Sequence, residues 1–513
     1  MDIFEKLQIL AESAKFDVSC SSSGGTRRGR TEPAVTISEG TASKNTKGSY
    51  INQKADITKG RGIRQTIGDC YKSGICHSFC ADGRCISLLK VLFTNKCVYD
   101  CKYCVNRRSA DTPRASFEPE ELAKLTIDFY KRNYIEGLFL SSGVEKSPDY
   151  TAERILKCLQ LLRHEYQFFG YIHAKIIPGV DQKLIEEIGL LADRLSVNIE
   201  MPTRESLALY APQKKPLDIM SPMKQITNTL IEQKSLKGPG YMFKGVSINS
   251  PANYLGAATA LEPAHELTGH QYTSIIPRQR AEKKAKFAPA GQTTQMIVGA
   301  GKENDLEIIS LSEKLYHTFK MKRVYFSAYI PVVKDAMLPS LDTKPPLRRE
   351  NRLYQADWLL RFYGFQAKEL LLESNPYFDE ELDPKTFWAL NNISYFPMEI
   401  NRASFEELLR VPGIGVISAK RIIRQRKIAC VRYEDLKLMG VVLKRAKYFI
   451  TCQGKYYGKE KSHAFTMDPE FLTAKIKMQN LSPLPTDTIA KEEALRIRAK
   501  LTGQDQGVQL SFV

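Results

Sequence analysis

Short apolar runs alternate with helical periodicity between residues 88 and 329. The apolar runs have the length and the branched or aromatic composition of buried strands, and they cover 88–95, 137–143, 171–177, 194–200, 293–300 and 323–329. Apolar residues at three- and four-residue spacing predict helices between them, at 119–133, 151–166, 182–192, 221–234 and 305–319. Strands that alternate with helices predict a parallel sheet with right-handed crossovers. Six such units fall short of the eight that close a full barrel, so we expect an α/β fold with a partial (β/α)6 barrel.

The pattern changes on both sides of this barrel. A stretch rich in Ser, Gly and Thr without apolar periodicity precedes it, and the predicted strands stop after residue 335. The expected organisation is an N-terminal helix at 1–20, a flexible linker at 21–65, the barrel at 66–335 with an insertion at 233–290, a helical connector at 336–395, a small all-α domain at 396–460 and a partly ordered tail at 461–513.

Charge and cysteine content narrow the functional classes. The 513 residues include 75 Lys and Arg against 57 Asp and Glu, and the net charge of +18 favours a polyanionic partner. No apolar run approaches the roughly 20 residues that span a bilayer. Asp2 and Glu5 stand where a secretory signal carries positive charge, so we expect a cytoplasmic protein without a membrane partner. In that reducing location the 11 cysteines are better candidates for metal ligands or buried thiols than for disulfides.

Three of these cysteines follow the first predicted strand. Cys97, Cys101 and Cys104 have C-x3-C-x2-C spacing, whereas a tetrahedral zinc site usually combines two closely spaced pairs. Three thiolates can hold three corners of a [4Fe–4S] cube and leave the last iron open to a substrate or cosubstrate. Buried thiols and a zinc site are the alternatives that the residues leave open.

The run "CVYDCKYC" resembles the signature of the radical S-adenosylmethionine (SAM) superfamily. The likeness includes the aromatic Tyr103 before the third cysteine and the position after the first barrel strand. It implies a partial radical SAM barrel, a [4Fe–4S] cluster on the three cysteines, and SAM bound to the open iron. The bound SAM would be cleaved to methionine and a 5'-deoxyadenosyl radical that abstracts a hydrogen atom.

The resemblance also implies SAM contacts near the ends of the strands. The positions that match these contacts are Tyr103, Ser142, Gly143, Asn198, Glu200 and Gly299. The segment "SSGVE" departs from the Gly-Gly-Glu-like pattern of the family, which leaves the contact of Ser142 and Gly143 open. Packing at the strand ends is the alternative for each position.

A second cysteine group precedes the barrel. Its members, which lie around His77, are Cys70, Cys76, Cys80 and Cys85. Four thiols and an imidazole suffice for a zinc site or an auxiliary iron–sulfur cluster. Their spacing matches no established motif, so buried thiols are the alternative to a second metal site.

The segment 401–427 contains a glycine turn between two predicted helices. Ser404 and Glu407 form a capping box for the first helix, and "VPGIG" ends it. The segment resembles the helix-hairpin-helix motif of DNA repair proteins. In that motif, glycines corresponding to Gly413 and Gly415 let backbone N–H groups approach a DNA phosphate at the positive end of the second helix. The basic residues that would add charge to the same contact are Lys420, Arg421 and Arg424.

The hairpin nearly recurs 27 residues later. Gly413 aligns with Gly440 and Ala419 with Ala446, while Val442 replaces the second glycine. Residues 420–459 carry twelve Lys or Arg and two acids, a local charge of +10. Such a face predicts binding to the DNA backbone with little sequence discrimination. A hairpin used only for packing or for protein contact is the alternative.

The cysteine loop and the hairpin together resemble radical SAM proteins assigned to DNA modification or repair. The likeness includes "LAESAKFDVSCSSSG", "FAPAGQTTQMIVGA" and "KRVYFSAYIPV". It implies an enzyme that modifies or repairs a nucleotide in DNA, and a uracil-DNA glycosylase-like protein as partner. A radical enzyme acting on RNA, and a DNA-binding iron–sulfur redox sensor without SAM turnover, are the alternatives.

Overall fold

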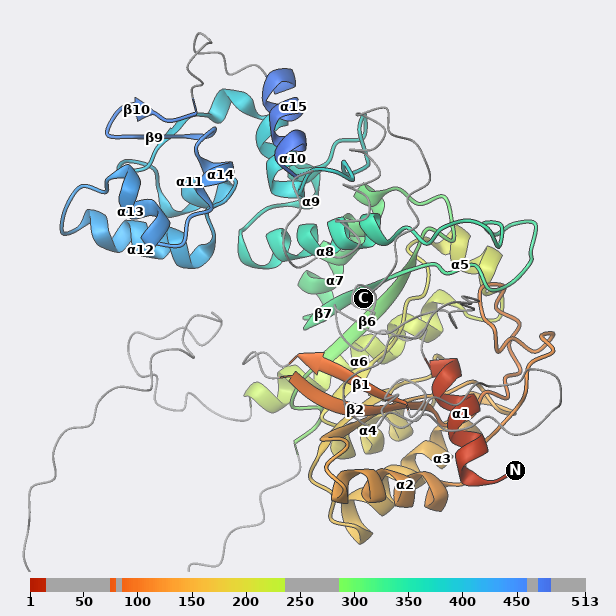
Figure 1. Cartoon of the computed structure of the whole chain (residues 1–513). Helices are drawn as coiled ribbons and strands as arrows, with labels where there is room; N and C mark the ends of the chain where they lie inside the picture. Colours follow the sequence, from red (N-terminus) through yellow and green to blue (C-terminus); the bar gives the residue numbers. More distant parts are fainter. Residues whose placement is uncertain (15–73, 80–84, 236–285, 459–468, 481–513) are drawn as a thin grey trace, which may run out of the picture.

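The computed structural model describes residues 1–14, 74–79, 85–235, 286–458 and 469–480 (Figure 1). The linker predicted at 21–65 lies outside these residues, as do most of the predicted insertion and most of the predicted tail. No helix in the described ranges is both long enough and apolar enough to cross a membrane.

A curved sheet of seven strands, in sequence order from β1 to β7, forms the centre of the barrel domain. The strands are β1 (Ile75–Phe79), β2 (Cys85–Leu92), β3 (Gly137–Ser141), β4 (Tyr171–Lys175), β5 (Arg194–Ser196), β6 (Gln292–Val298) and β7 (Arg323–Ala328). Strands β2 to β7 pair in parallel and confirm the six predicted strands. The sheet stays open, with β1 and β7 as its edges, so the α/β fold with a partial barrel is also confirmed.

Strand β1 was not predicted. It pairs antiparallel with β2, with Phe79 opposite Cys85. Its five residues lie inside the cysteine-rich run, where the thiols and His77 hide any strand pattern. The barrel domain therefore begins with a hairpin at the edge of the sheet rather than with the predicted first strand.

Consecutive helices pack against one another and form a layer along the sheet. The predicted helices are confirmed as α2 (Pro119–Lys131), α3 (Pro148–Gln160), α4 (Gln182–Leu191), α6 (Pro216–Ser235) and α7 (Asp305–Phe319). The structure adds α5 (Arg204–Tyr210), and the end of the helix predicted at 151–166 is a π-helical turn at Leu161–Glu165. The N-terminal helix α1 (Ile3–Ser13) packs on β2 and begins with a capping box between Asp2 and Glu5.

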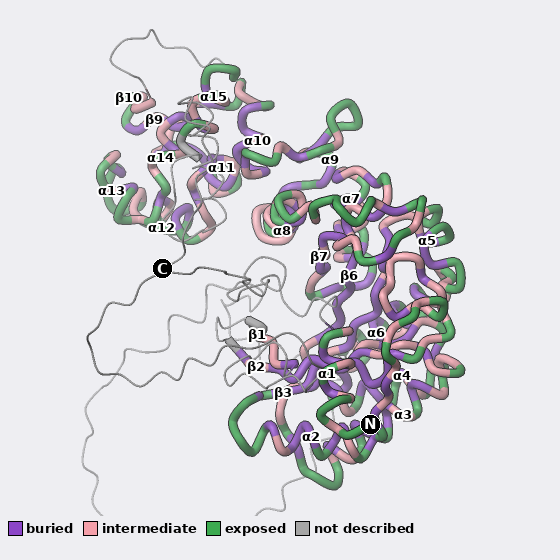
Figure 2. Tube along the Cα trace, turned by 45° about the vertical axis from the view of Figure 1, so that its right-hand side comes forward, coloured by how far each residue is buried: buried purple, intermediate pink, exposed green. Residues whose placement is uncertain are grey.

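Burial explains why the strands were readable from sequence. All five residues of β3 are buried, and so are most residues of β2 and β6. Figure 2 shows this buried centre, with exposed residues concentrated on the outer helices and loops. A strand covered on both faces favours a continuous apolar run, which is seen in β3, whereas in β6 only the C-terminal half is apolar.

The segment at 336–395, the predicted connector, includes three helices. It contains α8 (Leu347–Phe362), α9 (Ala367–Leu370) and α10 (Pro384–Asn391), followed by a 3-10 turn at Ile393–Tyr395. Figure 1 shows α8 between the barrel sheet and the C-terminal part. Helix α8 packs on β7, where the Glu350 carboxylate accepts a hydrogen bond from the Ala328 N–H at 2.7 Å.

The C-terminal part contains the helices α11 (Phe405–Arg410), α12 (Val416–Arg426), α13 (Tyr433–Leu438) and α14 (Leu443–Ala446). It is not all-α, which corrects the prediction: β8 (Met398–Glu399), β9 (Ile450–Cys452) and β10 (Lys455–Tyr456) form a small sheet. Strands of two or three residues are too short for periodicity to reveal. Helix α15 (Pro469–Asn480) is the described part of the tail. Its Lys477 Nζ forms an ion pair with Asp379 Oδ2 at 2.7 Å.

Candidate functional site

The three signature cysteines lie in the loop after β2, at the edge of the sheet where the parallel strands end. In barrel folds this edge carries the active site. Cys101 is buried, whereas Cys97 and Cys104 are partly exposed. The Val144 N–H donates to Cys97 Sγ at 3.4 Å, and the Asn106 N–H donates to Cys104 Sγ at 3.3 Å. Such N–H donors favour the thiolate form that iron requires.

Burial raises the pKa of two of these thiols, Cys101 and Cys104. It raises the pKa of Cys104 to about 12, against a smaller opposing effect of the Asn106 N–H. Burial also raises the pKa of Cys101, while the nearby Lys214 lowers it. Iron binding must therefore displace protons from both groups.

The geometry of the thiols bears on the type of metal group. In the described ranges, no three His, Cys, Asp or Glu side chains gather closely enough to hold a metal ion. The corners of a four-iron cube lie farther apart than the ligands of a single ion, so thiols from one loop can fit a cluster without forming a mononuclear site. The donor set, three sulfurs with N–H bonds to two of them, is that of an iron–sulfur site.

The segment after β3 pairs with the cysteine loop. The Gly143 N–H donates to Thr94 O at 2.7 Å, and the Val98 N–H donates to Val144 O at 2.8 Å. A Cβ at Gly143 would lie 2.8 Å from Lys96 O, which leaves no room for a side chain. The structure thus brings Ser142 and Gly143 to the cysteines, and Gly143 has a clear steric role in positioning Cys97.

Arg114 fixes the other side of the cysteine loop. Its guanidinium donates hydrogen bonds to four backbone carbonyls, with distances of 2.6 to 2.9 Å. Two of these carbonyls belong to Asn95 and Asn106, which flank the cysteines in sequence. Sequence reasoning missed Arg114, because an arginine in a polar loop carries no pattern that separates a structural role from solvent exposure.

A buried ion pair joins the end of β5 to the cysteine loop. Lys214 Nζ lies 3.0 Å from Glu200 Oε1 and donates to the Tyr103 hydroxyl at 3.3 Å. Burial alone would lower the pKa of Lys214, but Glu200 and Tyr103 outweigh it and hold the pKa well above its ordinary value. Lys214 is therefore a cation beside Cys101. The structure brings Tyr103 and Glu200 together through a lysine that the sequence did not single out, and their predicted contacts with SAM stay predictions.

The remaining predicted SAM contacts have different surroundings. Asn198 is buried at the end of β5. Gly299 follows β6 with φ of +85°, and a Cβ there would lie 2.7 Å from Pro346 Cγ. Its observed contact is thus with the start of α8, which agrees with the packing alternative. Whether it also contacts SAM stays a prediction.

Three buried side-chain oxygens follow the ends of β3, β6 and β7 and have no hydrogen-bond partner among the described residues. They are Ser142 Oγ, Glu303 Oε1 and Tyr329 Oη. An unpaired buried polar group costs about 1–3 kcal/mol. Such groups at an active-site edge are commonly satisfied by a ligand or by water. Ser142 was predicted as a contact, whereas Glu303 and Tyr329 were not.

The C-terminal helices form two glycine hairpins that pack against each other. Gly413 and Gly440 have φ of +84° and +85°, so both positions of the 27-residue repeat use the left-handed conformation. A Cβ at Gly413 would lie 2.6 Å from Val442 O, and the Val442 N–H donates to Gly413 O at 2.9 Å. Ser404 and Glu407 form the predicted capping box of α11.

The start of α12 also contacts the connector. The Tyr363 hydroxyl lies 3.4 Å from the position of a Cβ at Gly415. Lys385 Nζ donates to Ile414 O at 2.6 Å. The predicted basic residues Lys420, Arg421 and Arg424 are exposed on α12.

The second cysteine group is only partly described. Cys70 and Cys80 lie outside the described residues. Cys76 lies on β1 opposite Leu88, and Cys85 begins β2 opposite Phe79. A second metal site on these cysteines stays a prediction.

The family comparison identifies the barrel domain. Residues 91–229 match the model of the radical SAM superfamily, so the chain contains a radical SAM domain. Enzymes of this superfamily use a [4Fe–4S] cluster and SAM, and these are the cofactors of the domain. The matched range includes the three cysteines and their contacts with Val144 and Lys214.

Solved structures similar to this chain include two of HydG. An X-ray structure of the FeFe-hydrogenase maturase HydG from Carboxydothermus hydrogenoformans is 14% identical, with a TM-score of 0.33, and the match covers 53% of this chain and 50% of that one. A second structure, of HydG as a maturase of the [FeFe]-hydrogenase, is 12% identical, with a TM-score of 0.32, and the match covers 82% and 83%. The chain thus spans about half the length of the first. No curated protein matches the sequence.

Proposed function

We propose that this radical SAM enzyme acts on DNA, modifying or repairing a nucleotide held at the carboxyl ends of the barrel strands. The observation that supports this proposal is the presence, in one chain, of the cysteine loop and of a tandem glycine hairpin with an exposed basic helix. Paired hairpins of this type suit a DNA backbone, because they combine closely approaching backbone with positive charge.

In this proposal Cys97, Cys101 and Cys104 ligate three irons of the [4Fe–4S] cluster. The bound cluster supplies the electron that cleaves SAM to methionine and a 5'-deoxyadenosyl radical. The N–H groups of Val144 and Asn106 stabilise two thiolates. Lys214, held by Glu200, places a positive charge beside the third, which offsets part of the negative charge of the ligand set.

The unpaired oxygens at the strand ends support ligand binding at this edge. Ser142, Glu303 and Tyr329 would each gain a hydrogen-bond partner from bound SAM or from substrate. A nucleotide in a duplex would have to leave the base stack to reach them, at a cost of a few kcal/mol. Cytoplasmic location and a uracil-DNA glycosylase-like partner belong to the same proposal.

Anaerobic reconstitution tests the radical chemistry. We expect about four irons per chain and 5'-deoxyadenosine after reduction in the presence of SAM. Cys101→Ala should lose both, whereas Cys158→Ala should retain both, because Cys158 is a buried thiol on α3. A reducible cluster that never yields 5'-deoxyadenosine would favour the redox-sensor alternative, and zinc in place of iron would exclude the radical mechanism.

Salt-dependent binding tests the DNA role. Equal-length DNA and RNA duplexes are compared by fluorescence anisotropy across a salt series. We expect the protein to bind the DNA duplex more tightly than the RNA duplex. Lys420→Ala and Arg424→Ala should each reduce the magnitude of the slope of log K for binding against log salt concentration by about one. Lys131→Ala, an exposed lysine on α2 of the barrel, is the matched control. Tighter binding of RNA would favour the RNA alternative, and unchanged slopes would contradict the assigned face.

A further inference from the structure

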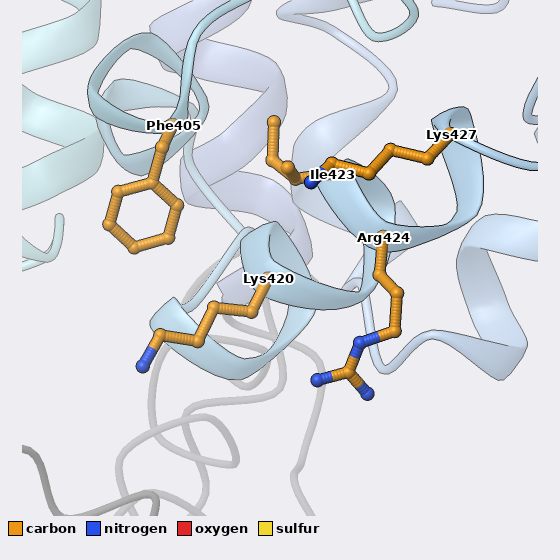
Figure 3. Close-up of a pocket in the computed structure, with 5 residues that line it drawn as sticks. All are labelled: Phe405, Lys420, Ile423, Arg424 and Lys427. Carbon is orange, nitrogen blue, oxygen red and sulfur yellow. The ribbon is translucent and has the colours of Figure 1, made fainter. Parts of the chain in front are cut away.

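A hollow of about 370 Å³ lies beside the first hairpin (Figure 3). Its described lining is Phe405 from the first turn of α11 and Lys420, Ile423, Arg424 and Lys427 from α12 and its C-terminal end. The spacing of the α12 residues places them on one face of the helix. Figure 3 shows the Phe405 ring and the Lys420 side chain extending to the same side.

The hollow combines apolar surface with positive charge. Phe405 and Ile423 are only partly buried, so each leaves apolar atoms accessible to a ligand. The three basic side chains that line the hollow are exposed. Two carboxylates belong to the same turn of α11: Glu407 is held by its capping bond to the Ser404 N–H at 2.6 Å, and Glu406 is exposed. Neither glutamate lines the hollow.

This chemistry distinguishes between the parts of a nucleic acid. Phosphates along a paired duplex need cations but offer nothing that would cover Phe405 and Ile423. An unpaired nucleotide offers both a flat base, which stacks on an aromatic ring, and a phosphate for the surrounding cations. We infer that the hollow binds the base of one unpaired nucleotide, so that the hairpin face prefers DNA with an extrahelical base. This inference rests on the DNA-binding role proposed above and specifies the form of DNA.

The position of the hollow is separate from the glycine turns. Gly413 contacts the second hairpin, and Gly415 lies beside Tyr363 of the connector. The hollow instead lies along the side of α12, near Arg424 and Lys427 in its last turns. The turns and the side of α12 can thus contact different parts of one DNA molecule, with phosphates at the turns and the unpaired base at Phe405.

Paired binding assays with the full chain test the inference. One probe is a fluorescein-labelled, fully paired duplex, and the other is the same duplex with a single unpaired 2-aminopurine. We expect roughly five-fold or tighter binding of the bulged probe and quenching of 2-aminopurine. Phe405→Ala should remove the preference and the quenching but change affinity for the paired duplex by less than about two-fold. Phe405→Tyr should restore both, which separates stacking from a folding defect, and Leu438→Ala, an exposed apolar residue on α13, is the matched control.

The outcomes separate this inference from the proposed function. Equal binding of the two probes by the wild type would overturn the inference that the hollow binds an unpaired base, and so would a preference that survives Phe405→Ala. Either result would leave the proposed DNA binding in place. Failure of both probes to bind would overturn the DNA role and the pocket together. Displacement of the bulged probe by a polyglutamate peptide but not by an unpaired oligonucleotide would also overturn the inference, because the hollow would then recognise acidic protein.

Discussion

Lys385 offers the sharpest test of the energetics of the C-terminal part. It lies on α10, buried, and its Nζ donates to Ile414 O in the glycine turn at 2.6 Å. The amine also lies 4.8 Å from the centroid of the Tyr363 ring. Burial lowers its pKa from 10.5 to about 7, Asp383 opposes this change and Arg410 adds to it. The perturbation is Lys385→Met, which keeps the apolar length and removes the amine.

The sign follows from proton binding. Because the pKa is lower in the folded state, the unfolded chain binds more protons between pH 7 and 10.5, and stability rises with pH through this window. At pH 7 the lowered pKa costs about 4 kcal/mol of stability, and raising the pH to about 10 recovers most of this cost. The variant avoids this cost but leaves Ile414 O without its donor, a loss of about 1–3 kcal/mol. We therefore expect Lys385→Met to be more stable by about 1–3 kcal/mol at pH 7, with the advantage vanishing or reversing near pH 10.

Tryptophan fluorescence reports on this region directly. The chain has two tryptophans, both in the connector, and Trp388 is buried on α10 only three positions after Lys385. Urea unfolding of the full chain is followed at pH 7, 8, 9 and 10 through the connector transition, because a chain of several parts need not unfold in one step. Lys368→Met, an exposed lysine on α9, is the control. If the free energy of unfolding changed with pH in the same way for Lys385→Met and the wild type, the reasoning would be refuted.

Three further predictions, one of them with a matched control, test the site and the hairpin. Gly143→Val should displace the cysteine loop, because its Cβ would lie 2.8 Å from Lys96 O; reconstituted iron should fall by more than about half, and unchanged iron would contradict this. Gly413→Ala should destabilise the hairpin pair by about 1–3 kcal/mol in the same fluorescence assay, because φ is +84° and Val442 O is 2.6 Å away. Gly415→Ala, whose nearest contact is at 3.4 Å, should not have this effect. Glu200→Gln should lower the stability of the barrel by about 3 kcal/mol, because it leaves the Lys214 cation buried without its partner. Urea unfolding followed by circular dichroism measures this change. An unchanged unfolding midpoint would argue against the Glu200–Lys214 ion pair.

The barrel strands could be predicted because burial on both faces imposes a continuous apolar run. Strand β3 shows this most clearly, whereas β6 is apolar only at its C-terminal end, because its first four residues, Gln292–Gln295, are buried polar residues. The Gly413 turn could be predicted for a different reason: a residue in the left-handed conformation between two helices selects glycine. In both cases the structural requirement applies to residues close in sequence, so the local sequence pattern is enough to predict the element.

The side chains that fix the site could not be predicted, because their roles depend on partners distant in sequence. Lys214 meets Tyr103 across 111 positions, and Lys385 meets Ile414 across 29. Each is a lysine in a polar stretch, where exposure to solvent is the ordinary expectation. The small strands β8 and β9 could not be predicted for the same reason. They form only when residues 398 and 450, which are distant in sequence, pair with each other.

The connector links the barrel to the hairpins through defined contacts rather than through an unstructured linker. At one end of α8, Glu350 accepts from the Ala328 N–H, at the end of β7. At its other end, Arg410 of the first hairpin donates to Tyr363 O at 3.0 Å. Because α8 is held at both ends, it fixes the distance between the hairpins and the barrel. DNA bound by the hairpins would therefore lie at a set distance from the strand ends. Under the proposed function, the target nucleotide would then be selected by its spacing from the held phosphates as well as by its chemistry.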